Sequence, residues 1–120
     1  MNDYPTLKQI QRAKEKLGSL IIETPSHPWN DTWLTNGIGR ATEIFVKLEL
    51  LQVTGTFKPR GALNVMLNLD KNQLKRGVTT VSAGNHAIAT AYASKALGTT
   101  AKVVMPKNAN SLRMQMAKDL

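Results

Sequence analysis

The feature that most constrains the fold is an alternation of helical and strand patterns between residues 59 and 120. Apolar residues at helical spacing follow Pro59. Two short runs rich in β-branched residues, 78–82 and 101–106, flank a second helical pattern that starts at Gly84. A third helical pattern covers residues 109–120. Strands that alternate with helices pair in parallel through right-handed crossovers. The sequence therefore predicts an α/β fold, a parallel sheet with flanking helices.

The first half of the chain is less regular. Residues 6–17 carry apolar positions at helical spacing and end at Gly18, which predicts an amphipathic helix. Residues 26–36 are typical of a loop, and residues 43–49 predict a strand because β-branched and aromatic side chains dominate there.

Composition excludes several classes of protein. Of the 120 residues 42% are hydrophobic and 20% charged, and none is cysteine, so disulfide and thiolate chemistry are excluded. No apolar run is long enough for a membrane span, and the N-terminus lacks a signal-peptide pattern, so we expect a cytoplasmic protein with no membrane partner. The net charge of +8 raises the possibility of nucleic-acid binding. The basic residues are scattered and few aromatic residues accompany them, so we expect no specific nucleic-acid partner.

Residues 54–62, Thr-Gly-Thr-Phe-Lys-Pro-Arg-Gly-Ala, contain the first group that can carry chemistry. Lys58 stands where a flexible turn meets a helix start, and a lysine becomes a nucleophile where a pocket or a nearby cation lowers its pKa. Arg60 is a candidate for that cation. The alternative is a surface lysine at a helix start, and the spacing alone favours this alternative.

The second group is Ser82-Ala83-Gly84-Asn85-His86, between a predicted strand and a predicted helix. A glycine at a helix N-terminus beyond a strand end can bind an anion through free backbone N–H groups. Helix capping by Ser82 or Asn85 is an equal alternative. We interpret His86 as holding this loop by hydrogen bonds, because no set of side chains has the spacing of metal ligands.

Together these two groups resemble the fold-type II pyridoxal-phosphate enzymes, and the threonine/serine dehydratase branch in particular. Thr24-Pro25, Lys47-Leu48-Glu49 and Gln52 precede the Lys58 motif in the order typical of that family, and residues 82–87 and 104–106 follow it. The resemblance spans nearly the whole chain. It implies an enzyme with pyridoxal 5'-phosphate as its cofactor and an amino acid as its substrate.

The resemblance also implies roles for individual residues. Lys58 would be the catalytic residue: it would bind the cofactor as an internal aldimine and later act as the base at Cα. Phe57 would pack near the cofactor ring, and Asn85 would hydrogen-bond the cofactor's phenolic oxygen. The loop of Ser82, Ala83, Gly84, Asn85 and His86 would surround the substrate carboxylate. The implied reaction is loss of the β-hydroxyl from L-threonine or L-serine, which gives a 2-oxo acid and ammonia.

One departure narrows the reaction further. Serine racemases of this family carry a second serine where this chain has Ala83, so the resemblance implies dehydration and not racemisation. A non-catalytic α/β module that binds a carboxylate or phosphate at Gly84-Asn85 is the alternative function.

The division of the chain follows from the same resemblance. Residues 1–50 would be an incomplete N-terminal segment of the large domain, and residues 51–120 a small α/β domain truncated at its C-terminal end. The family's glycine-rich phosphate loop and its pyridine-nitrogen contact are missing from the chain. We therefore expect the 120 residues alone to be inactive. The resemblance also implies that the full-length protein is a homo-oligomer.

Overall fold

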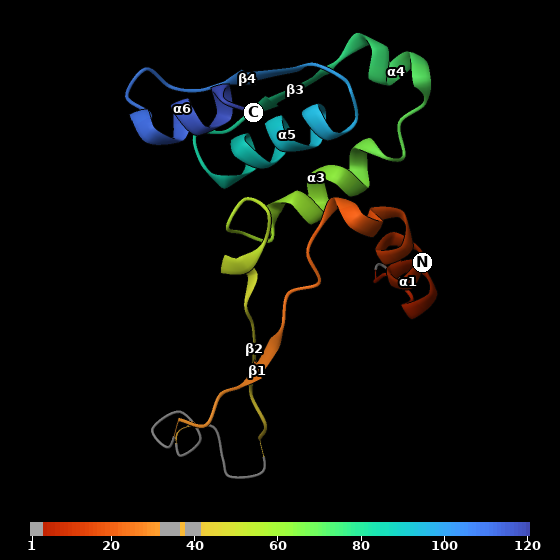
Figure 1. Ribbon diagram of the computed structural model, residues 1–120, viewed down its shortest axis with the longest axis vertical. Coiled ribbons are helices and arrows are strands. Elements are labelled where there is room, and N and C mark those ends of the chain that lie inside the picture. Colours follow the sequence, from red (N-terminus) through yellow and green to blue (C-terminus); the bar gives the residue numbers. More distant parts are fainter. Residues whose placement is uncertain (1–3, 32–36, 38–41) are drawn as a thin grey trace.

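In a computed structural model that describes residues 4–31, 37 and 42–120, the second half of the chain is built on a βαβ unit, which lies at the top of Figure 1. Strands β3 (Val78–Val81) and β4 (Ala101–Val104) pair in parallel, with Val78 opposite Ala101 and Val81 opposite Val104. Helix α5 (Asn85–Ala96) connects them. The predicted parallel sheet with flanking helices is therefore confirmed.

Helix α5 is buried on most of its surface. It packs against α3 (Lys58–Met66), α6 (Ser111–Lys118) and both strands of the parallel sheet. Its buried positions are mostly small, and Ala87, Ala89 and Ala93 have no exposed surface. Small side chains allow neighbouring elements to approach from several sides. The start of α5, which carries the predicted site loop, therefore belongs to the best-packed helix of the described chain.

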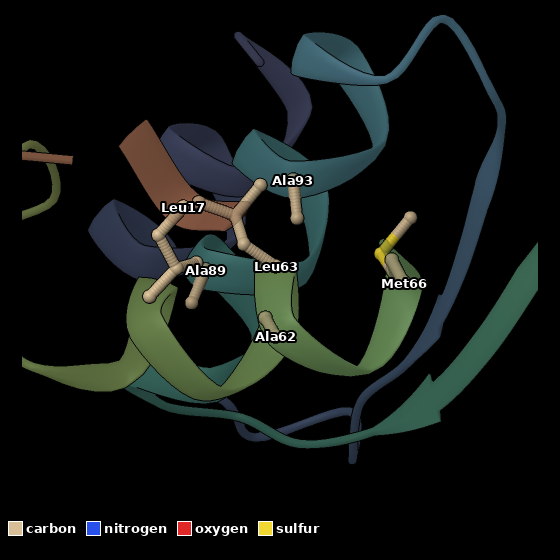
Figure 2. Close-up of a cluster of buried hydrophobic side chains, with 6 residues drawn as sticks. All are labelled: Leu17, Ala62, Leu63, Met66, Ala89 and Ala93. Atoms are coloured by element: carbon tan, nitrogen blue, oxygen red, sulfur yellow. The ribbon is translucent and has the colours of Figure 1, made fainter. Parts of the chain in front are cut away.

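The apolar core lies where three helices meet (Figure 2). Leu63 and Met66 of α3 contact Ala89 and Ala93 of α5, and Leu17, at the end of α1 (Leu7–Leu17), completes the cluster. Thr6 caps α1, with its hydroxyl accepting from the Gln9 N–H at 3.3 Å. The predicted helix over residues 6–17 is thus confirmed, and the core fixes α3 against α5.

Two short strands form a ribbon that extends away from this core (Figure 1). Strand β1 (Ser26–Pro28) pairs antiparallel with β2 (Phe45–Lys47). The prediction of a loop over residues 26–36 is therefore wrong for its first three residues, and residues 32–36 lie outside the described part. The predicted strand over residues 43–49 is shorter, because the 3₁₀ turn η2 (Glu49–Leu51) begins within it.

Further elements connect these parts of the fold. The 3₁₀ turn η1 (Gly18–Leu20) follows α1, and α4 (Lys71–Arg76) leads from α3 to β3. No helix among the described residues is both long and apolar enough to cross a membrane.

Candidate active site

The turn before α3 places Lys58 at the first position of that helix. Gly55 has φ +69°, a left-handed conformation that glycine adopts without strain. The Thr56 hydroxyl accepts the Lys58 N–H at 3.3 Å. Pro59 follows in the first helical turn, where its missing N–H costs nothing. Lys58 therefore stands where the sequence predicts it, at a helix start.

The amine of Lys58 is available for chemistry. Its Nζ lies 5.1 Å from the centroid of the Phe57 ring. Among the residues that the structure describes, this amine forms no hydrogen bond and no ion pair. Phe57 is itself 59% exposed, so its ring offers an open aromatic face beside the amine.

A cleft of about 620 Å³ opens beside Lys58 between α3, β3 and the start of α5. Its lining combines apolar side chains with polar and charged ones, which is typical of a small-molecule site. Lys58 and His86 both lie on its wall, so the cleft brings together the two groups that the sequence singles out. Phe57, Arg60, Gly61 and Ala62 also line the cleft and belong to the motif that the sequence singles out. Sequence reasoning missed the remaining lining residues, which are Val65, Met66, Leu69, Val78, Thr79, Thr80 and Thr90.

The loop of residues 82–86 has its own hydrogen bonds. The Ser82 hydroxyl accepts the Gly84 N–H at 3.2 Å, and the Asn85 Oδ1 accepts from Arg113 Nη1 at 2.9 Å. Gly84 is the N-cap residue of α5, and no side chain caps this helix. Helix capping by Ser82 or Asn85, the alternative interpretation of the motif, is therefore wrong, because both side chains have other partners.

His86 differs from the sequence prediction as well. Its ring lies on the cleft wall and forms no hydrogen bond within the described part of the chain, so it does not hold the loop in the expected way. Only its carbonyl has a side-chain partner, the Thr90 hydroxyl at 2.9 Å. The N–H groups of Asn85 and His86, in the first turn of α5, have no acceptor among the described residues, so they can bind an anion. Ser82, Ala83, Gly84 and Asn85 do not line the cleft.

Arg60, the candidate for a cation beside Lys58, is paired with a carboxylate. Its Nε and Nη2 bind the two carboxylate oxygens of Glu49 at 2.9 and 2.8 Å. These hydrogen bonds lower the pKa of Glu49 to about 2, although burial alone would raise it. A hydrogen bond from the Thr24 hydroxyl also lowers this pKa. The charge of Arg60 is therefore balanced by Glu49.

The same network ties the N-terminal segment to the Lys58 turn. The buried Gln52 side chain accepts the Ile22 N–H and donates to the Ile22 carbonyl, both at 2.8 Å. The buried Thr24 hydroxyl donates to Glu49 Oε1 at 2.6 Å. Sequence analysis found Thr24, Glu49 and Gln52 only through the family resemblance. The structure shows their task, which is to hold residues 22–24 against the segment that leads into α3.

The other hollows formed by the described residues lack this combination of groups. A second hollow of about 720 Å³ lies between α5, β4 and α6, but it contains none of the predicted site residues. Within residues 4–31, 37 and 42–120, no three His, Cys, Asp or Glu side chains gather in a way that could hold a metal ion. The cleft beside Lys58 is therefore the candidate active site.

Comparison with known proteins assigns the chain to a family. Residues 20–120 match the family described as "Pyridoxal-phosphate dependent enzyme". The chain belongs to the pyridoxal-phosphate dependent enzymes. This membership confirms the predicted cofactor, pyridoxal 5'-phosphate, and the resemblance on which that prediction rested.

Individual relatives and a solved structure support the assignment. The chain is 43% identical over 114 residues to phenylserine dehydratase from Ralstonia pickettii, covering 95% of this chain and 34% of the relative. It is 37% identical over 113 residues to catabolic L-threonine dehydratase from Staphylococcus aureus, covering 94% of this chain and 32% of the relative. The crystal structure of serine racemase from Dictyostelium discoideum superposes with a TM-score of 0.81 at 37% identity. The match covers 95% of this chain and 36% of the racemase chain. The chain thus spans about a third of the length of these relatives.

The residues of the cleft fit the family's cofactor. An aldehyde cofactor needs a primary amine, and Lys58 offers one without a competing partner among the described residues. An aromatic ring beside that amine can pack on a pyridine ring, and Phe57 has an exposed face. The cleft volume lies in the usual range for a small ligand. Lys58 and Phe57 are therefore the described residues best suited to hold pyridoxal phosphate in this pyridoxal-phosphate dependent enzyme.

Proposed function

We propose that this chain carries the lysine-bearing part of an enzyme that removes the β-hydroxyl group of L-threonine or L-serine, with release of ammonia. The observation that carries the proposal is the shared cleft, which places the amine of Lys58 and the first turn of α5 at His86 on one wall. Two of the compared relatives bear the name of dehydratases, which supports the same class of reaction.

The chain's own residues would divide the work as follows. Lys58 would hold pyridoxal phosphate through its amine, and the same amine would accept the proton from Cα of the substrate. Bound pyridoxal phosphate supplies an electron sink for the charge that develops at Cα. The N–H groups of Asn85 and His86 bind the substrate carboxylate. Cleavage of the Cα–H and Cβ–OH bonds would release one water, formed from the hydroxyl group and the proton taken from Cα, and would leave an enamine. One water then hydrolyses the imine tautomer of this enamine to a 2-oxo acid and ammonia.

Covalent trapping on the 120-residue chain tests the role of Lys58. The protein is mixed with a substoichiometric amount of pyridoxal phosphate and reduced with borohydride, and the labelled peptide is located by mass spectrometry. We expect the label on Lys58, and its loss in Lys58→Ala. The matched control is Lys71→Ala, which removes another exposed lysine from the first position of a helix and should leave the label unchanged.

The same experiment tests the non-catalytic alternative. A module that binds a phosphate or carboxylate at Gly84-Asn85 would retain pyridoxal phosphate without covalent attachment at Lys58. Label spread evenly over surface lysines, and unchanged in Lys58→Ala, would overturn the proposed role of this residue.

Ala83 supports elimination in preference to racemisation. A methyl group can neither donate nor accept a proton, so position 83 provides no base for the second face of the substrate. In the holoenzyme, Ala83→Ser should increase the formation of D-serine from L-serine relative to the release of ammonia. A holoenzyme with Ala83 that already forms D-serine faster than ammonia would contradict the proposal.

A further inference from the structure

Arg113 joins the first turn of α6 to the first turn of α5. Its Nη1 donates to Asn85 Oδ1 at 2.9 Å, although the two residues are 28 positions apart. Its own N–H donates to the side chain of Asn110, the N-cap residue of α6, at 3.2 Å. The guanidinium is therefore attached to a capped helix start, and it reaches one residue of the predicted site.

Gly84 makes room for this contact. A Cβ atom at position 84 would lie 3.3 Å from Arg113 Nη1, which is closer than ordinary van der Waals contact. A side chain at position 84 would push the guanidinium away from Asn85. Gly84 is therefore both the N-cap residue of α5 and the residue whose small size leaves space for the Arg113 guanidinium.

The contact determines which end of the Asn85 amide remains available. A primary amide has one acceptor oxygen and one NH₂ donor group, whereas a guanidinium has donors only. If the amide turned over, two donors would face each other at this point. Arg113 therefore holds Oδ1 through a charge-assisted hydrogen bond, and Nδ2 of Asn85 donates to no acceptor among the described residues.

We propose that Arg113 is a positioning residue that fixes Asn85 as a hydrogen-bond donor toward an oxygen of bound pyridoxal phosphate. This inference rests on the proposed function, because Asn85 does not itself line the cleft but directly precedes His86, which does, and the proposal needs its amide to face the bound cofactor. Arg113 itself touches neither the reacting atoms nor the cofactor. Its effect on the cofactor should pass through Asn85 alone.

A double-mutant cycle tests this relation. Apo-protein is titrated with pyridoxal phosphate for wild type, Arg113→Met, Asn85→Ala and the double variant, and both affinity and the visible absorbance of the bound cofactor are measured. We expect Arg113→Met to weaken binding by about tenfold, the effect of one lost hydrogen bond to an ion, and to change the visible spectrum. In the Asn85→Ala background, Arg113→Met should have no further effect.

Two controls sharpen the result. Arg113→Lys retains a cationic donor and should restore affinity to within about threefold of wild type. Arg76→Met removes an exposed arginine from the end of α4 and should leave affinity and spectrum unchanged. Arg113 is exposed, so its replacement should not unfold the chain, and the denaturation midpoint checks this.

The failures of the two proposals can be told apart. An equal loss of affinity on Arg113→Met with and without Asn85 would show that Arg113 acts independently, and would overturn the inference. Unchanged affinity and spectrum in Arg113→Met would overturn it as well. In both cases borohydride trapping at Lys58 would persist. Absence of trapping at Lys58 in wild type would overturn the proposed function and this inference together.

Discussion

Glu49 and Arg60 form a bidentate ion pair, and the turn that leads to Lys58 lies between them in sequence. Its two N–O distances are 2.9 and 2.8 Å, and Glu49 also accepts from Thr24 at 2.6 Å. The Glu49 side chain is 17% exposed, so removing one partner would leave a poorly hydrated charge. The pair should therefore matter both for stability and for the position of Lys58.

The pH dependence of stability follows from the low pKa of Glu49. The folded pKa of about 2 lies below the ordinary value of 4.5. The stabilisation is then complete above about pH 4.5 and is lost as the pH falls toward 2. We expect a loss of roughly 2 kcal/mol in the free energy of unfolding over this window, less than the full pKa difference implies because Arg60 is 31% exposed.

Glu49→Gln checks this assignment by denaturant unfolding at several pH values. The variant should be less stable at pH 7 by about 1 to 3 kcal/mol, and its stability should fall less steeply below pH 4.5. Glu23→Gln is the matched control, because Glu23 forms an exposed ion pair with Lys14 at 3.0 Å and should leave the pH profile nearly unchanged. Identical pH profiles for wild type and Glu49→Gln would rule out this role for Glu49.

Single residues of the site were predictable to different degrees. The position of Lys58 at a helix start was predictable because a turn, a proline and a helical pattern adjoin it in sequence, whereas its catalytic role came from the family resemblance. Arg113 could not, because its contact with Asn85 depends on how α6 packs against α5. The same limit explains Arg60, which lies two residues from Lys58 in sequence but whose partner in space is Glu49.

At the scale of elements, α3 links the core to the cleft. Leu63 is fully buried against α1 and α5, whereas Val65, two residues later, is 64% exposed and lines the cleft. One face of this helix thus supports the fold and another forms the site wall. Loosening the buried face should disturb the start of α3 and, with it, Lys58.

Leu63→Ala should destabilise the chain by about 2 to 5 kcal/mol, because it leaves a cavity where three helices meet. Val65→Ala on the same helix removes an exposed side chain and should cost less than about 1 kcal/mol. Urea denaturation followed by circular dichroism measures both values. Equal effects of the two substitutions would contradict the burial of Leu63.

The elements themselves were predicted where their signals are local. The glycine at position 18 that ends the first helix, a proline at position 59 and β-branched runs at β3 and β4 each act over a few residues. Strand β1 was missed because Ser26, His27 and Pro28 carry little strand preference. It forms only because β2, nearly twenty residues later, provides hydrogen-bond partners, and such distant pairing has no local pattern.

At the scale of the whole molecule, the net charge of +8 is spread over several surfaces. Basic side chains lie on α1, on α4 and on β4, which Figure 1 shows on different sides of the fold. Lys14 is paired with Glu23, and Lys16 donates to Asn68. We therefore expect several small basic patches, and not the single extended stripe that a nucleic-acid backbone would follow.

The salt dependence of DNA binding tests how this positive charge is distributed. Each phosphate that a protein neutralises steepens the fall of DNA affinity with salt, by close to one unit of slope in a double-logarithmic plot. Scattered patches can engage only a few phosphates at once, so we expect a slope no steeper than about −3 and no difference between unrelated duplexes. Fluorescence anisotropy with two duplexes between 50 and 200 mM salt, in the same protein preparation that traps pyridoxal phosphate, measures both quantities. A slope near −8, or a marked preference for one duplex, would require a continuous basic surface and would favour nucleic-acid binding over amino-acid chemistry.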